Sequence, residues 1–359
     1  MYIPFFDLKR QYQQLKNEID EAISDCLNQG KFIGGEIVQQ FEGQLSEFTG
    51  IKNTVSCGNG TDALQLALMS LDLPKNSKII IPSFTYIAPV EVAEFLGYEI
   101  IFADVDATTF NLTLEEIRKV YTDNVRAIIA VHLFGLPCAD IEKINTFCKK
   151  KSIFLIEDNA QSLGAERNIT RDSIITTSFF PTKNLGAHGD GGAVLTSDTR
   201  IAKRIKQIAQ HGQAKKYEHE IIGINSRLDT LQAAVLKVKL KHFESFLQKR
   251  RTIAHFYTEA LKNIPSIKIP DITAQHTFHQ YTIRVEKEQR NSLKEYLSEQ
   301  GIETNIYYHL PAHQQVAYQQ NICLKHTETL SKTVLSLPIF PELAQEEISY
   351  ITETIKNYF

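Results

Sequence analysis

The chain has 359 residues, of which 43% are hydrophobic and 23% are charged, and its formal net charge at pH 7 is −3. This length suits one large α/β domain with a smaller second domain, and the composition is ordinary for a soluble globular protein. The near-neutral charge and the dispersed Lys and Arg residues argue against nucleic-acid binding.

Neither a membrane segment nor a metal site is expected. No apolar run reaches membrane-spanning length, and the first ten residues lack the apolar core of a signal peptide. The odd number of cysteines and the absence of CxxC spacing argue against a disulfide framework and a zinc site (Cys26, Cys57, Cys138, Cys148 and Cys323). We therefore expect a cytoplasmic protein without metal.

Strands and helices are expected to alternate through the first half of the chain. An extended arm at residues 2–8 and helices at 9–29 and about 38–48 come first. Aliphatic runs then predict strands at residues 54–57, 78–82, 99–105, 126–131, 153–158 and 193–196. Helices are expected between them at 62–70, from 83–88 onward, at 140–150 and at 198–210. This pattern is typical of a mostly parallel, doubly wound α/β sheet covered on both faces.

The second half begins with a polar loop at residues 211–223 and a long helix at about 229–262. A strand at 279–285, a helix at 288–300 and a terminal helix follow, the last with Ile348, Ile351 and Ile355 on one face. We predict a large domain at residues 1–240 and a small C-terminal α+β domain at 241–359, with the boundary inside the long helix.

One lysine stands between aromatic residues and glycines, in the stretch SFFPTKNLGAHGDGG at residues 178–192. Desolvation there would lower the pKa of the Lys183 ammonium and free its amine as a nucleophile for Schiff-base chemistry. The alternative is a surface turn with an incidental lysine.

Two strand ends could support such chemistry, because ligands bind at the carboxyl ends of open α/β sheets. The turn at residues 58–61 could hold one phosphate on backbone N–H groups at a helix N-terminus, or could be a plain strand-to-helix turn. It is not a GxGxxG fingerprint, which disfavours a dinucleotide. Asp158 could pair with a protonated ring nitrogen, or could cap a helix.

Two further positions have similar alternatives. The Ser178 hydroxyl could add a phosphate hydrogen bond, or could bond its own backbone in a turn. Phe84 or Tyr86 could stack on a flat ring, or could belong to the core. Each signal is weak alone, but their order is that of a fold-type I enzyme dependent on pyridoxal phosphate (PLP).

Several longer strings carry a specific resemblance: NGTDALQLAL, IPSFTYIA, IEDNAQSLGA, SFFPTKNLGAHGDGGAV and GINSRLDTLQAAVL. They resemble the DegT/DnrJ/EryC1/StrS family of nucleotide-sugar aminotransferases, and the resemblance extends over nearly the whole chain. It is closest to the branch that aminates UDP-linked 3-keto-glucuronic acid sugars. The implied fold is that of fold-type I, aspartate aminotransferase-like PLP enzymes.

The resemblance also implies residue roles. Lys183 corresponds to the lysine that binds PLP covalently, Asp158 to the partner of the pyridine nitrogen, and Gln161 to a neighbour of the ring hydroxyl. Tyr86 is our choice for the stacking aromatic residue, with Phe84 as the alternative.

The phosphate would be held from two subunits. Gly60, Thr61 and Ser178 correspond to the phosphate-binding residues of one subunit, and Asn225 to a residue that reaches the same phosphate from its neighbour. The resemblance thus implies a homodimer with shared active sites.

Four residues would face the substrate: Arg227, Tyr307, Tyr308 and His313. Arg227 could instead pair with Asp229 or Glu220. His309 stands where the family commonly has proline, and Tyr307 where some 3-keto-uronate enzymes have histidine. The segment between Gly164 and Ser178 is shorter than usual, so we expect a trimmed loop there.

The implied reaction is a transamination with L-glutamate as amino donor. The acceptor would be a nucleotide-linked 3-keto-hexose of the UDP-2-acetamido-3-oxo-glucuronate or dTDP-3-keto-6-deoxyhexose type, for cell-surface glycan such as lipopolysaccharide. The alternatives are a 4-keto sugar and a non-catalytic regulator that binds PLP or sugar. A dehydratase of the same family is disfavoured because such enzymes have histidine in place of Lys183.

Overall fold

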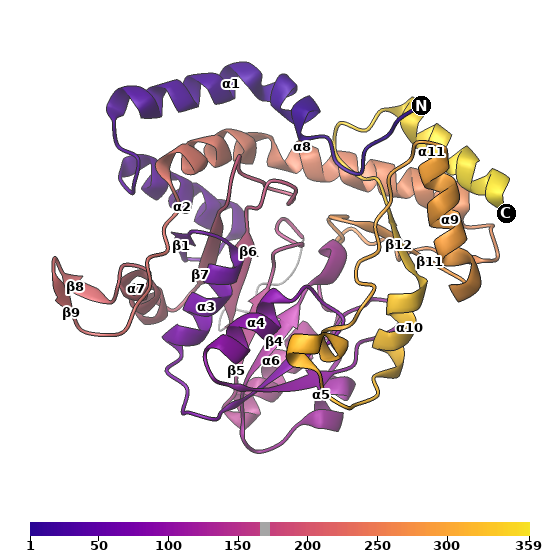
Figure 1. Cartoon of the computed structure of the whole chain (residues 1–359). Coiled ribbons are helices and arrows are strands. Elements are labelled where there is room, and N and C mark those ends of the chain that lie inside the picture. Colours follow the sequence, from indigo (N-terminus) through magenta and orange to yellow (C-terminus); the bar gives the residue numbers. More distant parts are fainter. Residues whose placement is uncertain (166–172) are drawn as a thin grey trace.

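The computed structural model describes residues 1–165 and 173–359, which form a central seven-stranded sheet beside a smaller three-stranded one (Figure 1). The large sheet has the order β1-β7-β6-β5-β4-β2-β3. Its strands are Asn53–Cys57 (β1), Lys78–Pro82 (β2), Glu99–Ala103 (β3), Val125–Val131 (β4), Phe154–Asp158 (β5), Ile174–Ser178 (β6) and Gly192–Thr196 (β7). Since β7 alone runs antiparallel to its neighbours, the prediction of a mostly parallel sheet is confirmed.

Helices pack on both faces of the large sheet, because its strands carry apolar side chains on both sides. Ile128 and Ile129 of β4 point to opposite faces, and both are fully buried. Ile129 shares a core with α3 (Gly60–Ser70), α4 (Ala88–Phe95) and α7 (Thr199–Ile208). Ile128 shares a second core with α5 (Leu114–Val120) and α6 (Ile141–Lys151).

The long helix α8 (Thr230–Leu261) crosses both parts of the molecule (Figure 1). Its Leu247 packs with α1 (Leu8–Gln29) and α2 (Glu36–Thr49), whereas its Ile253 belongs to the C-terminal core. The division of the chain at residue 240 stays a prediction, and the packing partners of α8 change between these two residues. Although α8 has 32 residues, no helix in the described part is long and apolar enough to cross a membrane.

The C-terminal core lies between a small antiparallel sheet and its helices. The strands are Ile267–Lys268 (β10), Tyr281–Val285 (β11) and Val334–Leu337 (β12). The helices are Lys287–Glu299 (α9), Lys325–Thr333 (α10) and Gln345–Tyr358 (α11), and single 3₁₀ turns occur at Leu133–Gly135, Ala312–Gln314 and Val316–Tyr318.

The N-terminal arm packs in this C-terminal core, although we expected it with the large domain. Ile3 is fully buried there and its backbone bridges that of Ile302. At the start of α1, Arg10 forms a two-pronged ion pair with Glu347 of α11, with N–O distances of 2.7 and 2.8 Å. The N-terminal arm and the first turn of α1 are therefore attached to the C-terminal part of the chain.

The sequence prediction missed several elements, above all β6 in the middle of the sheet. We expected only a trimmed loop between Gly164 and Ser178, and part of that segment, 166–172, lies outside the described residues. The run Ile174–Ser178 contains two threonines and so lacks the unbroken aliphatic signal of the other central strands, yet Thr176 and Thr177 are buried. The expected polar loop at 211–223 contains a hairpin of β8 (Gln213–Lys215) and β9 (Glu218–His219).

Candidate active site

A cavity of about 920 Å³ lies at the carboxyl edge of the large sheet. One side is a sheet-edge wall, which we define as Gly60, Thr61, Asp158, Ser178 and Lys183. The opposite side is a loop wall, which we define as residues 306–310 and 312 from the C-terminal part. Parallel strands bring their carboxyl ends to one edge, so residues distant in sequence meet there. Nine of the twelve predicted site residues line the cavity: Gly60, Thr61, Tyr86, Asp158, Gln161, Ser178, Lys183, Tyr307 and Tyr308.

The turn after β1 opens into this cavity at the N-terminus of α3. Asn59 caps the helix, since its Oδ1 accepts the backbone N–H of Asp62 at 2.8 Å. A Cβ added to Gly60 would lie 2.6 Å from Cβ of Ser178, and one added to Gly192 would lie 2.3 Å from the carbonyl oxygen of Asn59. Glycine therefore allows α3, β6 and β7 to meet, which leaves a cradle suited to an anion at the positive end of the helix.

Ser178 ends β6 beside this cradle. Its Oγ accepts the backbone N–H of Phe180 at 3.2 Å, so the local turn bond that we considered as an alternative is present. The hydroxyl also lines the cavity, where its proton could be donated to a phosphate oxygen.

Lys183 projects from a tight turn after β6. The backbone N–H of Lys183 donates to the Phe180 carbonyl at 2.8 Å, and a Cβ on Gly186 would lie 2.2 Å from the Pro181 carbonyl oxygen. This turn directs the amine into the cavity, so Lys183 is not an incidental lysine on an open surface turn. Burial lowers the pKa of the Lys183 ammonium, and the Asp158 carboxylate opposes that effect.

Asp158 is the last residue of β5 and is 7% exposed. Burial raises the pKa of its carboxyl, while the Ala160 N–H hydrogen bond (3.0 Å) and the Lys183 ammonium hold it down. The residues that follow form a turn and not a helix, so Asp158 is not a helix cap. The adjacent parallel strands β5 and β6 thus bring two groups to one cavity: the Asp158 carboxylate at the end of β5 and the Lys183 amine in the turn after β6.

Gln161 and the aromatic residues complete the wall. Gln161 is held by two hydrogen bonds, because its Oε1 accepts the Phe134 backbone N–H (2.6 Å) and its Nε2 donates to the Tyr308 hydroxyl (3.3 Å). Tyr86 is 58% exposed and lines the cavity, whereas Phe84 is 1% exposed and belongs to the core. Of the two aromatic residues considered for stacking, Tyr86 is therefore the one that lines the cavity.

Three predicted residues do not line the cavity. Asn225 and Arg227 are exposed on the segment before α8, and Arg227 forms no ion pair with Asp229 or Glu220 in the described chain. His313 is fully buried behind the loop wall, where it bonds Ser83.

Sequence reasoning missed His279 and Gln280, which line the cavity at the start of β11. Both are at most 4% exposed, and no hydrogen bond within the described residues reaches His279 Nδ1 or Gln280 Oε1. Burial lowers the pKa of the His279 imidazole well below its ordinary value, and the nearby Lys183 ammonium adds to the effect. The sequence does contain a signal for them, because two polar residues open the strand predicted at residues 279–285.

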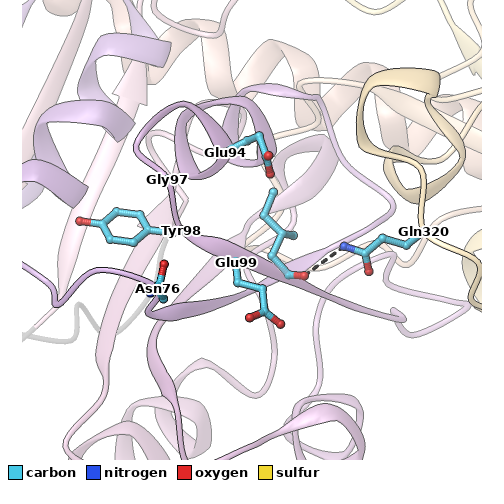
Figure 2. A pocket seen from close by; sticks show the side chains of 7 residues that line it. Asn76, Glu94, Gly97, Tyr98, Glu99 and Gln320 are labelled. Atoms are coloured by element: carbon cyan, nitrogen blue, oxygen red, sulfur yellow. Dashed lines mark hydrogen bonds between the residues drawn. The ribbon is translucent and has the colours of Figure 1, made fainter.

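A second, open depression of about 540 Å³ lies at the amino-terminal end of β3 (Figure 2). Its lining includes the carboxylates Glu94 and Glu99, and Gln320 donates to the Ile100 carbonyl at 3.1 Å there. None of the predicted site residues lines it. Nowhere in residues 1–165 and 173–359 do three His, Cys, Asp or Glu side chains gather to hold a metal ion.

The first cavity fits the cofactor that the sequence implies. The glycine cradle accommodates a phosphate, a buried carboxylate can face a ring nitrogen, and an exposed tyrosine is available for stacking. Thr85 and His279 also line the cavity, and neither Thr85 Oγ1 nor His279 Nδ1 has a hydrogen-bond partner among the described residues.

Comparison with known proteins gives the same result. A profile of the DegT/DnrJ/EryC1/StrS aminotransferase family matches residues 13–356. The chain is 38% identical to the UDP-2-acetamido-2-deoxy-3-oxo-D-glucuronate aminotransferase of Pseudomonas aeruginosa, over 99% of this chain and 100% of that protein. It is 37% identical to a pleiotropic regulatory protein of Geobacillus stearothermophilus, over 100% of this chain and 99% of that one.

A solved structure with the same fold contains a bound cofactor. NtdA from Bacillus subtilis with bound cofactor PMP has a TM-score of 0.95 and 28% identity, over 99% of this chain and 85% of that chain. The resemblance read from the sequence, its fold class and its cofactor are confirmed. The chain belongs to the DegT/DnrJ/EryC1/StrS aminotransferase family and is a PLP-dependent aminotransferase.

Proposed function

We propose that this chain transfers an amino group from L-glutamate to C-3 of a nucleotide-linked 3-keto-hexose. The observation that carries the proposal is that Lys183 and Asp158, close enough to influence each other's charge, share a cavity lined by residues of both parts of the chain. The cavity volume of about 920 Å³ is at the upper end of small-molecule sites, which suits a cofactor together with a nucleotide sugar. The Pseudomonas relative, named for a UDP-linked 3-oxo sugar, supports the 3-keto class.

PLP supplies an electron sink when it is bound, and the residues of the chain do the rest. Asp158 would accept the N–H of the pyridine ring and keep the ring charged. Lys183 would hold the cofactor and, once released as a neutral amine, would move a proton between the cofactor and the substrate carbon. Its lowered pKa favours that neutral form. Gln161, already fixed by two hydrogen bonds, would face the ring hydroxyl.

The phosphate would lie in the glycine cradle. Gly60 and Thr61 would donate backbone N–H groups at the start of α3, and the Ser178 hydroxyl would add a third donor. Tyr86 would stack on the cofactor ring. These four residues line the same cavity as Lys183.

The active form would be a homodimer that shares its sites. Asn225 and Arg227 are exposed and do not line the cavity of their own chain, as expected of residues that serve a neighbouring cavity. The nearby β8–β9 hairpin projects from the body of the molecule (Figure 1), and Tyr217 in its turn and Ile222 shortly after it are 79% and 88% exposed. Such apolar side chains on a projecting hairpin favour a partner surface. We place the enzyme in cytoplasmic synthesis of cell-surface glycan precursors.

A regulatory function is the second candidate, because the Geobacillus relative is named as a regulatory protein. Lys183, Asp158 and the glycine cradle are all present, and a protein that only senses a ligand would not need the amine. A 4-keto sugar substrate is the remaining alternative within the same chemistry.

The test is a panel of nucleotide-linked 3-keto and 4-keto sugars with glutamate, with amino-sugar products measured by mass spectrometry. We expect turnover with a 3-keto sugar. Product from 4-keto sugars alone would move the assignment to C-4. Absence of product with the whole panel, together with cofactor binding that glutamate does not bleach, would favour the regulator.

A further inference from the structure

His313 lies in a buried junction between the two parts of the chain. It is fully buried and follows Ala312, the last residue of the loop wall. Its partner is Ser83, which follows β2 and precedes the segment 84–86 on the other side of the cavity. Three hydrogen bonds join them: Ser83 Oγ to His313 Nδ1 (2.7 Å), the His313 N–H to Ser83 Oγ (3.1 Å), and the Ala312 N–H to the Ser83 carbonyl (3.0 Å).

The hydrogen-bond pattern determines the tautomer of His313. Ser83 is fully buried, and its Oγ has no other acceptor among the described residues. If Nδ1 carried the proton, the Ser83 hydroxyl proton would have no acceptor. The Ser83 hydroxyl can donate only to Nδ1, whereas a proton on Nε2 faces the carboxylate of Glu328, so the hydroxyl donates to Nδ1 and the ring proton sits on Nε2.

Glu328 of α10 supports the same assignment. Its Oε1 lies 3.6 Å from His313 Nε2, too far for a hydrogen bond but close enough to favour an N–H over a lone pair facing it. The order Ser83, His313, Glu328 matches a hydrolase triad in residue types only. The Ser83 hydroxyl is buried and already bonded, so no substrate can reach it as a nucleophile.

We infer that His313 is a positioning residue, which fastens the loop wall to the segment 84–86 through Ser83 and thereby sets the width of the cavity. Aromatic rings of the loop wall and of segment 84–86 also lie close together: the centroid of the Tyr308 ring is 6.4 Å from that of Tyr86 and 6.2 Å from that of Phe84. A direct contact between His313 and the sugar, which the sequence led us to expect, does not agree with its burial. The inference rests on the proposed function for its kinetic readout alone.

The test is a double-mutant cycle on the holoenzyme with Ser83→Ala, His313→Leu and the pair. Each single variant should raise KM for the keto sugar roughly tenfold and change kcat less than about threefold, since it loosens a binding wall and leaves Lys183 in place. The double variant should be no worse than the worse single one, because both remove the same bond. His313→Asn, whose Oδ1 can accept from Ser83, should restore KM to within about threefold. Glu328→Gln is the matched control: it keeps an acceptor oxygen near Nε2 and leaves the Ser83–His313 bonds in place, so KM should stay within about threefold of wild type.

Additive KM effects, or a Ser83→Ala enzyme with wild-type KM, would overturn the inference and return His313 to direct contact. A second measurement needs no turnover: ¹⁵N NMR of His313 should show an unprotonated Nδ1, and a protonated Nδ1 would also overturn the inference. If the wild-type enzyme accepts no nucleotide sugar, the proposed function fails. The NMR result and the same cycle measured in Tm still decide the role of His313.

Discussion

The two walls of the cavity are built in different ways. The sheet-edge wall comes from the ends of parallel strands and from a glycine cradle where neighbouring segments leave no room for a Cβ, so its geometry follows from the fold. The loop wall is a non-repetitive segment that is held by side-chain hydrogen bonds across the two parts of the chain. The shape of the sheet-edge wall, on the cofactor side, is therefore set by the backbone of the fold. The shape of the loop wall, on the substrate side, depends on a few side-chain hydrogen bonds.

The largest expected effect lies in the sheet-edge wall. Lys183→Ala should lower kcat by on the order of 10³-fold or more, since it removes both the attachment of the cofactor and the group that moves the proton. Steady-state assays with glutamate and the keto sugar measure it, and the yellow colour of the lysine-bound cofactor should be lost. Tm of the cofactor-free variant serves as the folding control. Full activity in this variant would refute the proposed chemistry.

Next comes the glycine cradle. Gly60→Ala places a Cβ 2.6 Å from Ser178 Cβ, which should cost about 1–3 kcal/mol of stability and weaken PLP binding roughly tenfold or more. Equilibrium dialysis with PLP and thermal denaturation measure the two effects.

Gly43→Ala is the matched control for that variant. Gly43 lies in α2 with nothing within 4 Å of its Cβ position, so alanine there should stabilise by about 0.5–1 kcal/mol and leave PLP binding unchanged. Equal PLP affinity in the Gly60 and Gly43 variants would show that the cradle does not hold the phosphate.

A smaller effect is expected from residues that would serve the neighbouring cavity. Arg227→Ala should raise KM for the nucleotide sugar about tenfold, because it removes one charge-assisted contact. Heterodimers test more sharply whether Arg227 serves the site of the neighbouring subunit. Heterodimers of Lys183→Ala and Arg227→Ala chains should contain one site that lacks both groups and one intact site. An Arg227→Ala homodimer with wild-type KM, or heterodimers without any site of wild-type KM, would contradict the shared site.

The smallest expected effect is on stability against pH in the cofactor-free protein. Burial raises the pKa of Asp158 above its ordinary value of 3.8, so the native state holds this proton more tightly than the unfolded chain does. The stabilising contribution therefore grows as the pH falls below the raised pKa, and it is lost as the pH rises. Asp158→Asn should be the more stable protein at pH 7, and its advantage in Tm should shrink by a few degrees toward pH 4. A Tm difference that does not change with pH would contradict the raised pKa.

Much of the sheet-edge wall could be predicted from the sequence. Aliphatic runs locate strand ends: Asp158 is the last residue of β5, and the phosphate turn directly follows β1. β6 escaped prediction because two of its residues are threonines, which give no apolar signal in the sequence. They are buried because the strand lies between other strands of the sheet. His279 escaped because its place in the cavity depends on how the C-terminal sheet docks on the large one.

The sequence by itself determined the family and the cofactor, and it predicts Lys183 as the lysine that binds the cofactor, because a covalent and phosphate-binding site needs specific residue types at strand ends. Only the tertiary structure decided that Tyr86 and not Phe84 faces the cavity, and that His313 lies behind the loop wall. It also placed Asn225 and Arg227 outside the cavity of their own chain. The physical reason is that exposure and side-chain direction depend on packing between segments far apart in the chain, and a local pattern contains no information on that packing.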